Sequence, residues 1–356
     1  MLPEKKGRTY WLAAVQQNGH ALEYVPEELR DRELCLAAVQ QDGYALMHVP
    51  EELRDQEMCL EAVQQNGYAL QFVPKLLRYP ELYLIAVWNG LSLTGVPEGL
   101  RDRELCLAAV HNQGWVLYYV PEEFRDREMC LAAVQQHGDA LEYVPEELRN
   151  RKLCLAAVQQ DGVALEYVPK ELRDREMCMT AVRQNGIALD YVPEKLRDWE
   201  MSMAAVQQNG LALKYVLEEL RDREMCLTAV QSVGLALQDV PEELRNRDLC
   251  MEAVRQNGWT LRYVPEELRD HGLCLAAVQQ EGMVLKRVSE EFRDRELCLA
   301  AVRQNGMALE YVPDSLKTRE ICETAVANDS DARWLEPETY ADEVEEKEDA
   351  SPSPGM

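Results

Sequence analysis

The chain has 356 residues, of which 47% are hydrophobic and 29% are charged, a composition typical of a water-soluble protein with enough apolar side chains for a core. Its 38 Lys and Arg residues stand against 64 Asp and Glu residues, and the net charge of −26 disfavours binding to nucleic-acid phosphates or to an anionic membrane surface. A basic partner is favoured instead. The sequence contains no apolar run of about 18 residues and no signal-peptide core near its beginning, so we expect no membrane segment.

Glycine recurs with a period of 24 residues, which is broken once by a one-residue deletion between Gly67 and Gly90. A period of this length indicates a solenoid of stacked repeats. Counted from each glycine, the third residue is always Leu, the sixth is always Val, and an Ala-Val pair follows later in every unit. These invariant apolar residues predict the core. The thirteen repeat glycines are Gly19, Gly43, Gly67, Gly90, Gly114, Gly138, Gly162, Gly186, Gly210, Gly234, Gly258, Gly282 and Gly306.

The first predicted element, residues 9–18, aligns with the long helix of a repeat, so residues 1–18 are interpreted as an N-terminal capping helix derived from a truncated repeat. Residues 19–326 then form the tandem array. In its first unit Asp31 is a favourable N-cap for a helix of about three turns, which we expect to end before Gly43. We interpret this glycine, and those at the same position in the other units, as a C-cap in the left-handed conformation.

Each long helix is preceded by two short helical turns, which are separated by a proline such as Pro50. The alternative is a single helix from Pro26 to Gln41. The apolar residues between Leu29 and Leu34 depart from the 3.6-residue helical phase, so the broken arrangement is favoured.

The array ends with a last long helix at residues 318–326, which brings the number of long helices to fourteen. Ser330 then replaces the glycine, and residues 327–337 are interpreted as a degenerate C-terminal cap. Residues 338–356 are acidic and nearly without apolar side chains, so we expect a disordered tail. The predicted fold class is all-α, an α-solenoid of about thirteen 24-residue helical repeats that form a curved right-handed superhelix.

The recurring unit, close to ELRDRELCLAAVQQNG followed by ALEYVPEEL, resembles the short helical repeat known as domain of unknown function 4116. The resemblance covers residues 9 to about 326 and implies a fold of tandem helical repeats. It implies no enzymatic activity and no catalytic residue. The chain departs from that pattern mainly in its recurrent Pro and Cys residues.

All cysteines occupy one column of the repeat. Adjacent members of the column are separated by a helix packing distance of about 9 Å, which exceeds the roughly 7 Å Cα limit of a disulfide and is too long for a shared zinc ion. We therefore expect buried packing positions and a reducing compartment, the cytoplasm. The eleven residues are Cys35, Cys59, Cys106, Cys130, Cys154, Cys178, Cys226, Cys250, Cys274, Cys298 and Cys322.

Two further columns raise the hypothesis of a ligand-binding ladder. Arginine stands at the eleventh position after the glycine, from Arg30 to Arg293, and is replaced once by Lys317. The acids around it favour structural roles, namely ion pairs and the capping of carbonyl groups, over phosphate binding. Tyrosine is frequent at the fifth position, where Asp239 and Arg287 also occur, and packing at the rim is favoured over ligand stacking.

The pattern predicts no catalytic, cofactor-binding or metal-binding residue. The five histidines fall in different columns, no glycine-rich phosphate loop occurs, and the paired glutamates recur in most units as solvated first-turn residues. We therefore expect a non-catalytic scaffold or adaptor, not an enzyme, that binds a protein or peptide through its solenoid surface. The alternatives are a nucleic-acid-binding helical repeat protein and an enzyme with a site in the irregular repeat at residues 72–124.

Residues 72–124 depart most from the consensus and contain eight of the chain's 24 aromatic residues. Aromatic side chains are frequent anchors of protein interfaces. We therefore predict a partner-binding site made of four rings exposed together on one face, those of Trp88, Trp115, Tyr118 and Tyr119. The competing interpretation is that these rings repack a locally damaged core.

Overall fold

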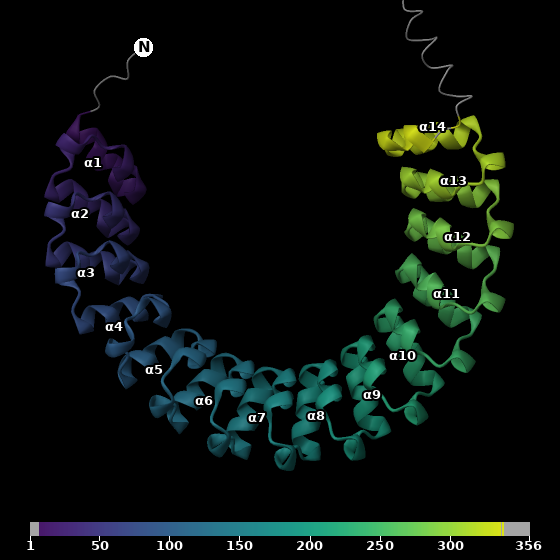
Figure 1. Cartoon of the computed structure of the whole chain (residues 1–356), viewed down its shortest axis with the longest axis horizontal. Coiled ribbons are helices and arrows are strands. Elements are labelled where there is room, and N and C mark those ends of the chain that lie inside the picture. The colour runs from purple at the N-terminus through teal and green to yellow at the C-terminus, as the bar shows by residue number, and fades with distance from the viewer. Residues whose placement is uncertain (1–6, 336, 338–356) are drawn as a thin grey trace, which may run out of the picture. The chain divides into compact units, whose positions relative to one another are not determined.

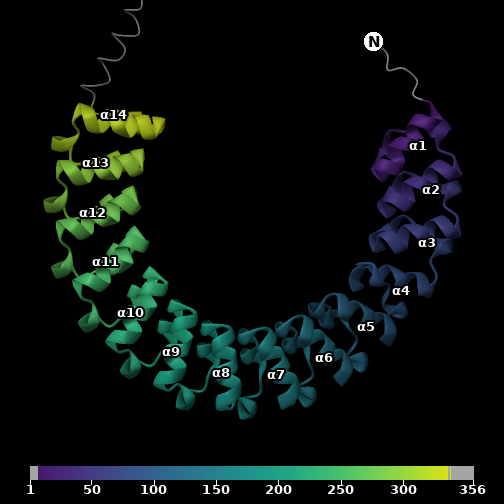
Figure 2. The ribbon, with the colours of Figure 1, turned by 180° about the vertical axis from the view of Figure 1, so that it is seen from behind.

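The computed structural model describes residues 7–335 and residue 337, which form helices joined by short non-helical segments. No β-strand occurs in this part of the chain. The chain divides into two compact units, Met1–Met177 and Cys178–Met356, and within each unit successive α-helices lie side by side in chain order (Figure 1, Figure 2). The all-α repeat solenoid is confirmed, whereas its curvature and right-handed twist stay predictions. The predicted tail, residues 338–356, lies outside the described residues.

The long helices have nine or ten residues each, and the described part of the chain contains fourteen of them, as expected. Those of the first unit are α1 (Arg8–Gln17), α2 (Arg32–Gln41), α3 (Gln56–Gln65), α4 (Pro80–Trp88), α5 (Arg103–Asn112), α6 (Arg127–Gln136) and α7 (Arg151–Gln160), while α8 (Arg175–Gln184) contains the boundary. Those of the second unit are α9 (Trp199–Gln208), α10 (Arg223–Ser232), α11 (Arg247–Gln256), α12 (His271–Gln280), α13 (Arg295–Gln304) and α14 (Arg319–Asn328).

Successive α-helices are connected through 3-10 helices, normally one of six residues followed by one of three. The six-residue helices are η1 (Gly19–Tyr24), η3 (Gly43–His48), η5 (Gly67–Phe72), η9 (Gly114–Tyr119), η11 (Gly138–Tyr143), η13 (Gly162–Tyr167), η15 (Gly186–Tyr191), η17 (Gly210–Tyr215), η19 (Gly234–Asp239), η21 (Gly258–Tyr263), η23 (Gly282–Arg287), η25 (Gly306–Tyr311) and η27 (Ser330–Leu335). The three-residue helices are η2 (Glu27–Leu29), η4 (Glu51–Leu53), η6 (Lys75–Leu77), η7 (Leu93–Gly95), η8 (Glu98–Leu100), η10 (Glu122–Phe124), η12 (Glu146–Leu148), η14 (Lys170–Leu172), η16 (Glu194–Leu196), η18 (Glu218–Leu220), η20 (Glu242–Leu244), η22 (Glu266–Leu268), η24 (Glu290–Phe292) and η26 (Asp314–Leu316).

The beginning of α2 shows how a capping side chain separates the short and long helices. The carboxylate of Asp31 accepts a hydrogen bond of 2.9 Å from the amide of Leu34, which confirms the predicted N-cap. Helix η2 ends at Leu29, and Arg30 and Asp31 are non-helical. The alternative of a single helix from Pro26 to Gln41 is therefore wrong, because an aspartate can cap a helix only where the preceding backbone has left the helical conformation.

The core lies between the α-helices and the six-residue 3-10 helices of neighbouring repeats. In the first full repeat Leu22, Cys35 and Ala38 have no exposed surface, and Val25 is almost completely buried. All eleven cysteines are buried and none forms a disulfide bond, which confirms them as packing positions. Within the described residues, none of the helices is both long and apolar enough to cross a membrane.

The repeat glycines are required for a reason that differs from the predicted one. Within the described residues only Gly90 has a positive φ. In a regular repeat the residue before the glycine is extended, as Asp42 is, and the glycine begins the next 3-10 helix. The left-handed C-cap is therefore wrong for the regular repeats. A Cβ atom on Gly43 would lie 2.2 Å from the carbonyl oxygen of Ala62 in the following α-helix, so only glycine fits there.

The irregular repeat does contain the predicted C-cap. Gly90 has a φ of 97°, and its amide donates a 3.1 Å hydrogen bond to the carbonyl of Val87. The amide of Leu91 donates to the carbonyl of Ala86 at 2.9 Å. This pair of hydrogen bonds is the Schellman motif. Helix α4 is one residue shorter than a regular long helix, and its C-cap Asn89 has a φ of −99° and a ψ of 29° instead of the extended conformation of Asp42. The following helix η7 is shortened to three residues.

Candidate partner-binding site

One surface of the repeats is formed by the solvent side of the six-residue 3-10 helices. The second, third and sixth residues after the repeat glycine are directed to the core, as the buried Leu46 and Val49 show. The first, fourth and fifth residues therefore remain at the surface, which we call the 3-10 face. In η9 these three positions are occupied by Trp115, Tyr118 and Tyr119.

The rings of η9 and η11 form the aromatic cluster, which consists of Trp115, Tyr118, Tyr119 and Tyr143. The ring centroids are 4.9 Å apart for Tyr118 and Tyr119, 5.2 Å for Tyr118 and Tyr143, and 6.1 Å for Trp115 and Tyr119. All three pairs meet edge to face, a preferred geometry of aromatic pairs. The exposed fractions are 39% for Trp115, 58% for Tyr118 and 37% for Tyr119, so the rings face solvent instead of filling the core.

The structure brings together three of the four predicted site residues. Trp88, at the end of α4, is 67% exposed, but the ring contacts of the cluster do not include it. Other aromatic residues of the segment 72–124 have different roles. Tyr83 is buried in the core, and Phe72 contacts Tyr44 at a centroid distance of 5.0 Å.

Arg125 joins the two 3-10 helices that contain the cluster. Its Nη2 donates to the carbonyl of Tyr118 at 3.1 Å, its Nη1 to that of Tyr143 at 3.2 Å, and its Nε to that of Val120 at 2.8 Å. Arg30, four repeats earlier in the chain, makes the same set of three bonds to backbone carbonyls of its own and the next repeat. The predicted carbonyl capping is thus confirmed for these arginines, whereas the predicted ion pairs with neighbouring acids are wrong for them.

Acidic side chains border the cluster on the 3-10 face. Asp139 and Glu142 lie on η11, Glu166 lies on η13, and all three are exposed. A hydrogen bond to Glu142 raises the pKa of Tyr143 above its ordinary value. The pKa of Tyr167 is raised by burial and, to a smaller extent, by the negative charges around it. The surface beside the rings therefore has a negative potential, which attracts cations.

Tyr143 and its acidic neighbours were not among the predicted site residues. Tyr143 stands 24 residues after Tyr119, in the same column of the repeat, and Glu142 has the same relation to Tyr118. Because one repeat step brings equivalent positions side by side, a search for aromatic residues at this spacing finds the missing ring.

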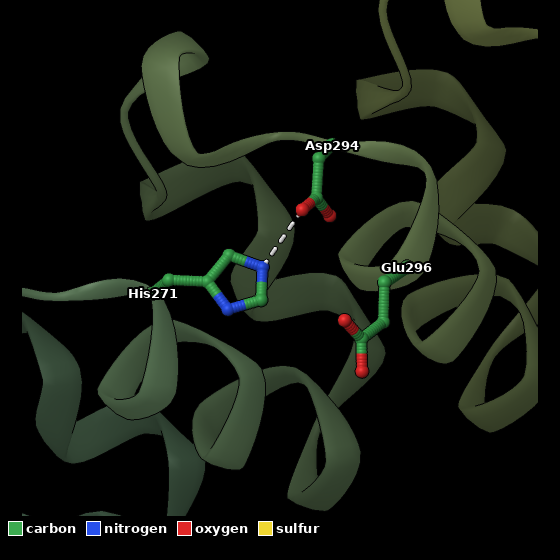
Figure 3. A group of neighbouring side chains, drawn as sticks. All are labelled: His271, Asp294 and Glu296. Carbon is green, nitrogen blue, oxygen red and sulfur yellow. Dashed lines mark ion pairs between the residues drawn. The ribbon is translucent and has the colours of Figure 1, made fainter.

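The second unit contains a different group of chemically active side chains. Among the described residues, His271, Asp294 and Glu296 form the one group of three whose potential metal-ligating atoms all lie within 4.8 Å of one another (Figure 3). His271 is the first residue of α12, Asp294 is the N-cap of α13, and Glu296 belongs to the first turn of α13.

The repeats match one known protein family. The profile of a family described as a domain of unknown function (DUF4116) matches the chain as overlapping pairs of repeats. Between residues 8 and 335 the matches leave out residues 79–101, which belong to the irregular repeat. No curated protein matches the chain. The matched segments are residues 8–54, 31–78, 102–149, 126–173, 150–197, 174–221, 198–245, 222–269, 246–293, 270–317 and 294–335.

Proposed function

The chain belongs to the family of repeats described as a domain of unknown function (DUF4116), and we propose that it is a non-catalytic scaffold that binds a protein or peptide through its 3-10 face. The observation that supports this proposal is the aromatic cluster of Trp115, Tyr118, Tyr119 and Tyr143, whose rings contact one another at the surface. Arg125 holds the backbone that carries these rings by hydrogen bonds to the carbonyls of Tyr118 and Tyr143. Aromatic rings on such a fixed backbone lose little conformational freedom when a partner binds, and such rings anchor interfaces. The eleven cysteines, which form no disulfide bond, support a reducing compartment, the cytoplasm, as its location.

The partner that fits this surface is a basic segment. Lys and Arg side chains bind over the faces of aromatic rings, and the carboxylates of Asp139, Glu142 and Glu166 beside the cluster attract the same side chains. Residues 336–356 contribute eight acids and one Lys to the charge of −26, so the rest of the chain keeps a net charge of −19. The attraction of a basic partner therefore does not depend on the acidic end of the chain.

The proposal is tested by titrating the full-length protein with fluorescent peptides rich in Arg and Lys, and with acidic peptides of the same length. We expect binding of the basic peptides only. The double variant Trp115→Ala/Tyr119→Ala should lower the affinity at least tenfold, while its circular dichroism and melting temperature stay nearly unchanged. Tyr24→Ala is the matched control, because Tyr24 is 71% exposed on the 3-10 face outside the cluster.

Two results would contradict the proposal. If the double variant melts several degrees lower and binds as tightly as the wild type, the rings stabilise the fold and the partner binds elsewhere. If binding is unaffected by about 0.5 M salt, in the full chain or after removal of residues 338–356, the partner is not recognised by its charge. We expect the affinity to fall with salt in both proteins.

A second candidate function, nucleic-acid binding, is favoured by one local feature of the 3-10 face in the second unit. Lys286 Nζ lies 4.9 Å from the ring centroid of Trp259, and the guanidinium of Arg262 lies 4.5 Å from that of Tyr263. Arg287 adds a third cation on the neighbouring η23. Cations interleaved with rings are typical of surfaces that bind single-stranded nucleic acid. A salt titration with mixed RNA and DNA distinguishes the candidates, because the variant Arg262→Ala/Lys286→Ala weakens only nucleic-acid binding.

A further inference from the structure

A ladder of ion pairs connects the first turns of successive α-helices. Arg32, the first residue of α2, donates to Asp55 at 2.8 Å and to Glu57 at 2.5 Å in the next repeat. Asp55 is at the same time the N-cap of α3, because its other oxygen accepts from the amide of Met58. The same bidentate bridge is made by Arg8, Arg103 and Arg151. The carboxylate pair at the beginning of a long helix is thus a cation-binding site that the preceding repeat normally fills with a guanidinium.

One repeat replaces this guanidinium by an imidazole. His271 stands at the arginine position of α12, facing Asp294 and Glu296 of the next repeat (Figure 3). Its Nε2 lies 2.9 Å from Oδ2 of Asp294. The Nε2 atom is itself buried and is not aligned for a hydrogen bond with any group. An imidazole thus stands where Arg8, Arg32, Arg103 and Arg151 place a permanently charged guanidinium between two carboxylates.

We propose that His271, Asp294 and Glu296 bind a divalent transition-metal ion, with Zn²⁺ as the best-fitting common ion. One imidazole nitrogen and two carboxylate oxygens are ligands that zinc accepts at about 2.0–2.2 Å, whereas Mg²⁺ and Ca²⁺ prefer oxygen ligands alone. Two ligands at such distances from one tetrahedral zinc ion are separated by roughly 3.4 Å, so Nε2 and Oδ2, now 2.9 Å apart, have to move apart by about half an ångström to admit the ion. The potential ligand atoms of all three residues lie within 4.8 Å of one another, and the exposed side chain of Glu296 can rotate toward the ion.

The site links two repeats, because the nitrogen ligand comes from α12 and both carboxylates come from the beginning of α13. Asp294 keeps its capping bond to the amide of Leu297 through Oδ1, which leaves Oδ2 for the metal. The carboxylates are exposed, so water fills the remaining coordination positions. The metal would therefore replace the missing arginine bridge between neighbouring repeats.

The test is calorimetric titration of the folded, tag-free, full-length protein with ZnCl₂, followed by Co²⁺ absorption spectroscopy. We expect one binding site that His271→Arg weakens at least tenfold, since arginine is the residue that most other repeats place there and cannot ligate a metal. Glu296→Gln should weaken the same site. His20→Gln is the matched control, because His20 pairs with Asp42 at 2.9 Å but belongs to no such group of three among the described residues. Millimolar Mg²⁺ should not displace the zinc.

Equilibrium binding is preferred over melting curves because the eleven cysteines of the unfolded chain would also bind zinc. Circular dichroism of each variant shows whether it is folded. If His271→Arg is folded and binds Zn²⁺ as tightly as the wild type, or if His20→Gln weakens binding equally, the proposed site is wrong.

Discussion

Gly138 lies so close to the carbonyl oxygen of Ala157 that a Cβ atom on the glycine would be 2.5 Å from that oxygen. The same close approach exists between Gly43 and Ala62. Glycine is needed at these positions because the backbone of a 3-10 helix lies directly against the next α-helix, not because the glycine adopts a left-handed conformation. This contact sets the spacing between neighbouring repeats.

The first prediction concerns this glycine. Gly138→Ala should lower the free energy of unfolding by about 1–3 kcal/mol, because a backbone oxygen cannot move away without displacing α7. Gly90→Ala should cost about 1 kcal/mol for a different reason: no atom lies within 4 Å of its Cβ position, but its φ is positive. Urea unfolding followed by circular dichroism measures both changes.

Gly99→Ala is the control for both variants. A Cβ atom there meets no atom within 4 Å, and the φ of Gly99 is not in the left-handed region. We expect a change of less than about 0.5 kcal/mol. Equal losses of stability for Gly138→Ala and Gly99→Ala would contradict the close-packing explanation.

The second prediction concerns the thiols. Burial raises the pKa of Cys35 and of Cys59 to about 11, so little thiolate is present at pH 8. Labelling of the folded protein with a disulfide reagent should therefore be slow at most of the eleven cysteines and fast in urea. A reductant should leave the melting temperature unchanged, because no disulfide exists to reduce. Fast stoichiometric labelling of the folded protein would show that the column is accessible.

The third prediction concerns the arginine that links η9 and η11. Arg125→Ala removes three hydrogen bonds to backbone carbonyls and should cost about 1–3 kcal/mol of unfolding free energy. It should also weaken peptide binding, because two of these bonds hold the backbone of Tyr118 and Tyr143. Arg101 occupies the same column but donates only to the carbonyl of Val96, so Arg101→Ala should cost less. Similar losses in the two variants would contradict a linking role for Arg125.

The fourth prediction concerns pH. A hydrogen bond from the amide of Met58, assisted by the guanidinium of Arg32, holds the pKa of Asp55 below its ordinary value. The unfolded carboxyl group, with a pKa near 4, therefore binds a proton at a pH where the folded one does not, so stability falls as the pH drops through the folded pKa. Asp55→Asn keeps the N-cap acceptor but loses the charge. The wild type should be more stable by less than about 1 kcal/mol at pH 7, since the pair is exposed.

The difference between the wild type and Asp55→Asn should disappear at a pH below the folded pKa, where the wild-type side chain is protonated as well. Unfolding midpoints measured from pH 7 down to about pH 2.5 check this. A difference that is constant over the whole range would mean that the charge of Asp55 does not contribute.

Much of the repeat was predictable because each unit contains its own local signals. Asp31 caps α2 as expected, and the invariant Leu, Val, Ala and Cys columns form the core. Repetition within one chain shows which positions never vary, and in a solenoid those positions contact the neighbouring repeats. The same internal comparison of repeats identifies the irregular repeat and the aromatic residues near it.

The partners of the recurring polar residues were not predictable in the same way. Arg125 and Arg32 stand two positions apart in the repeat unit and are surrounded by similar acids, yet the first caps carbonyl groups and the second pairs with carboxylates. Their side chains are long and flexible, so sequence spacing does not determine which groups they reach. The sequence shows that His271 stands in the arginine column, but only the structure shows that it faces two carboxylates of the next repeat.

The period, the helical elements and the buried columns can be predicted from the amino-acid sequence, because they follow from local capping and from apolar residues that recur at a constant spacing. The reason why the glycines are needed is visible only in the folded chain. A glycine after a helix looks the same in sequence whether it has a positive φ, as Gly90 does, or lies against the backbone of the next helix, as Gly138 does. The two cases differ in whether the glycine touches the next repeat, which depends on how the repeats pack. The same packing brings together the rings of the aromatic cluster, which come from neighbouring repeats.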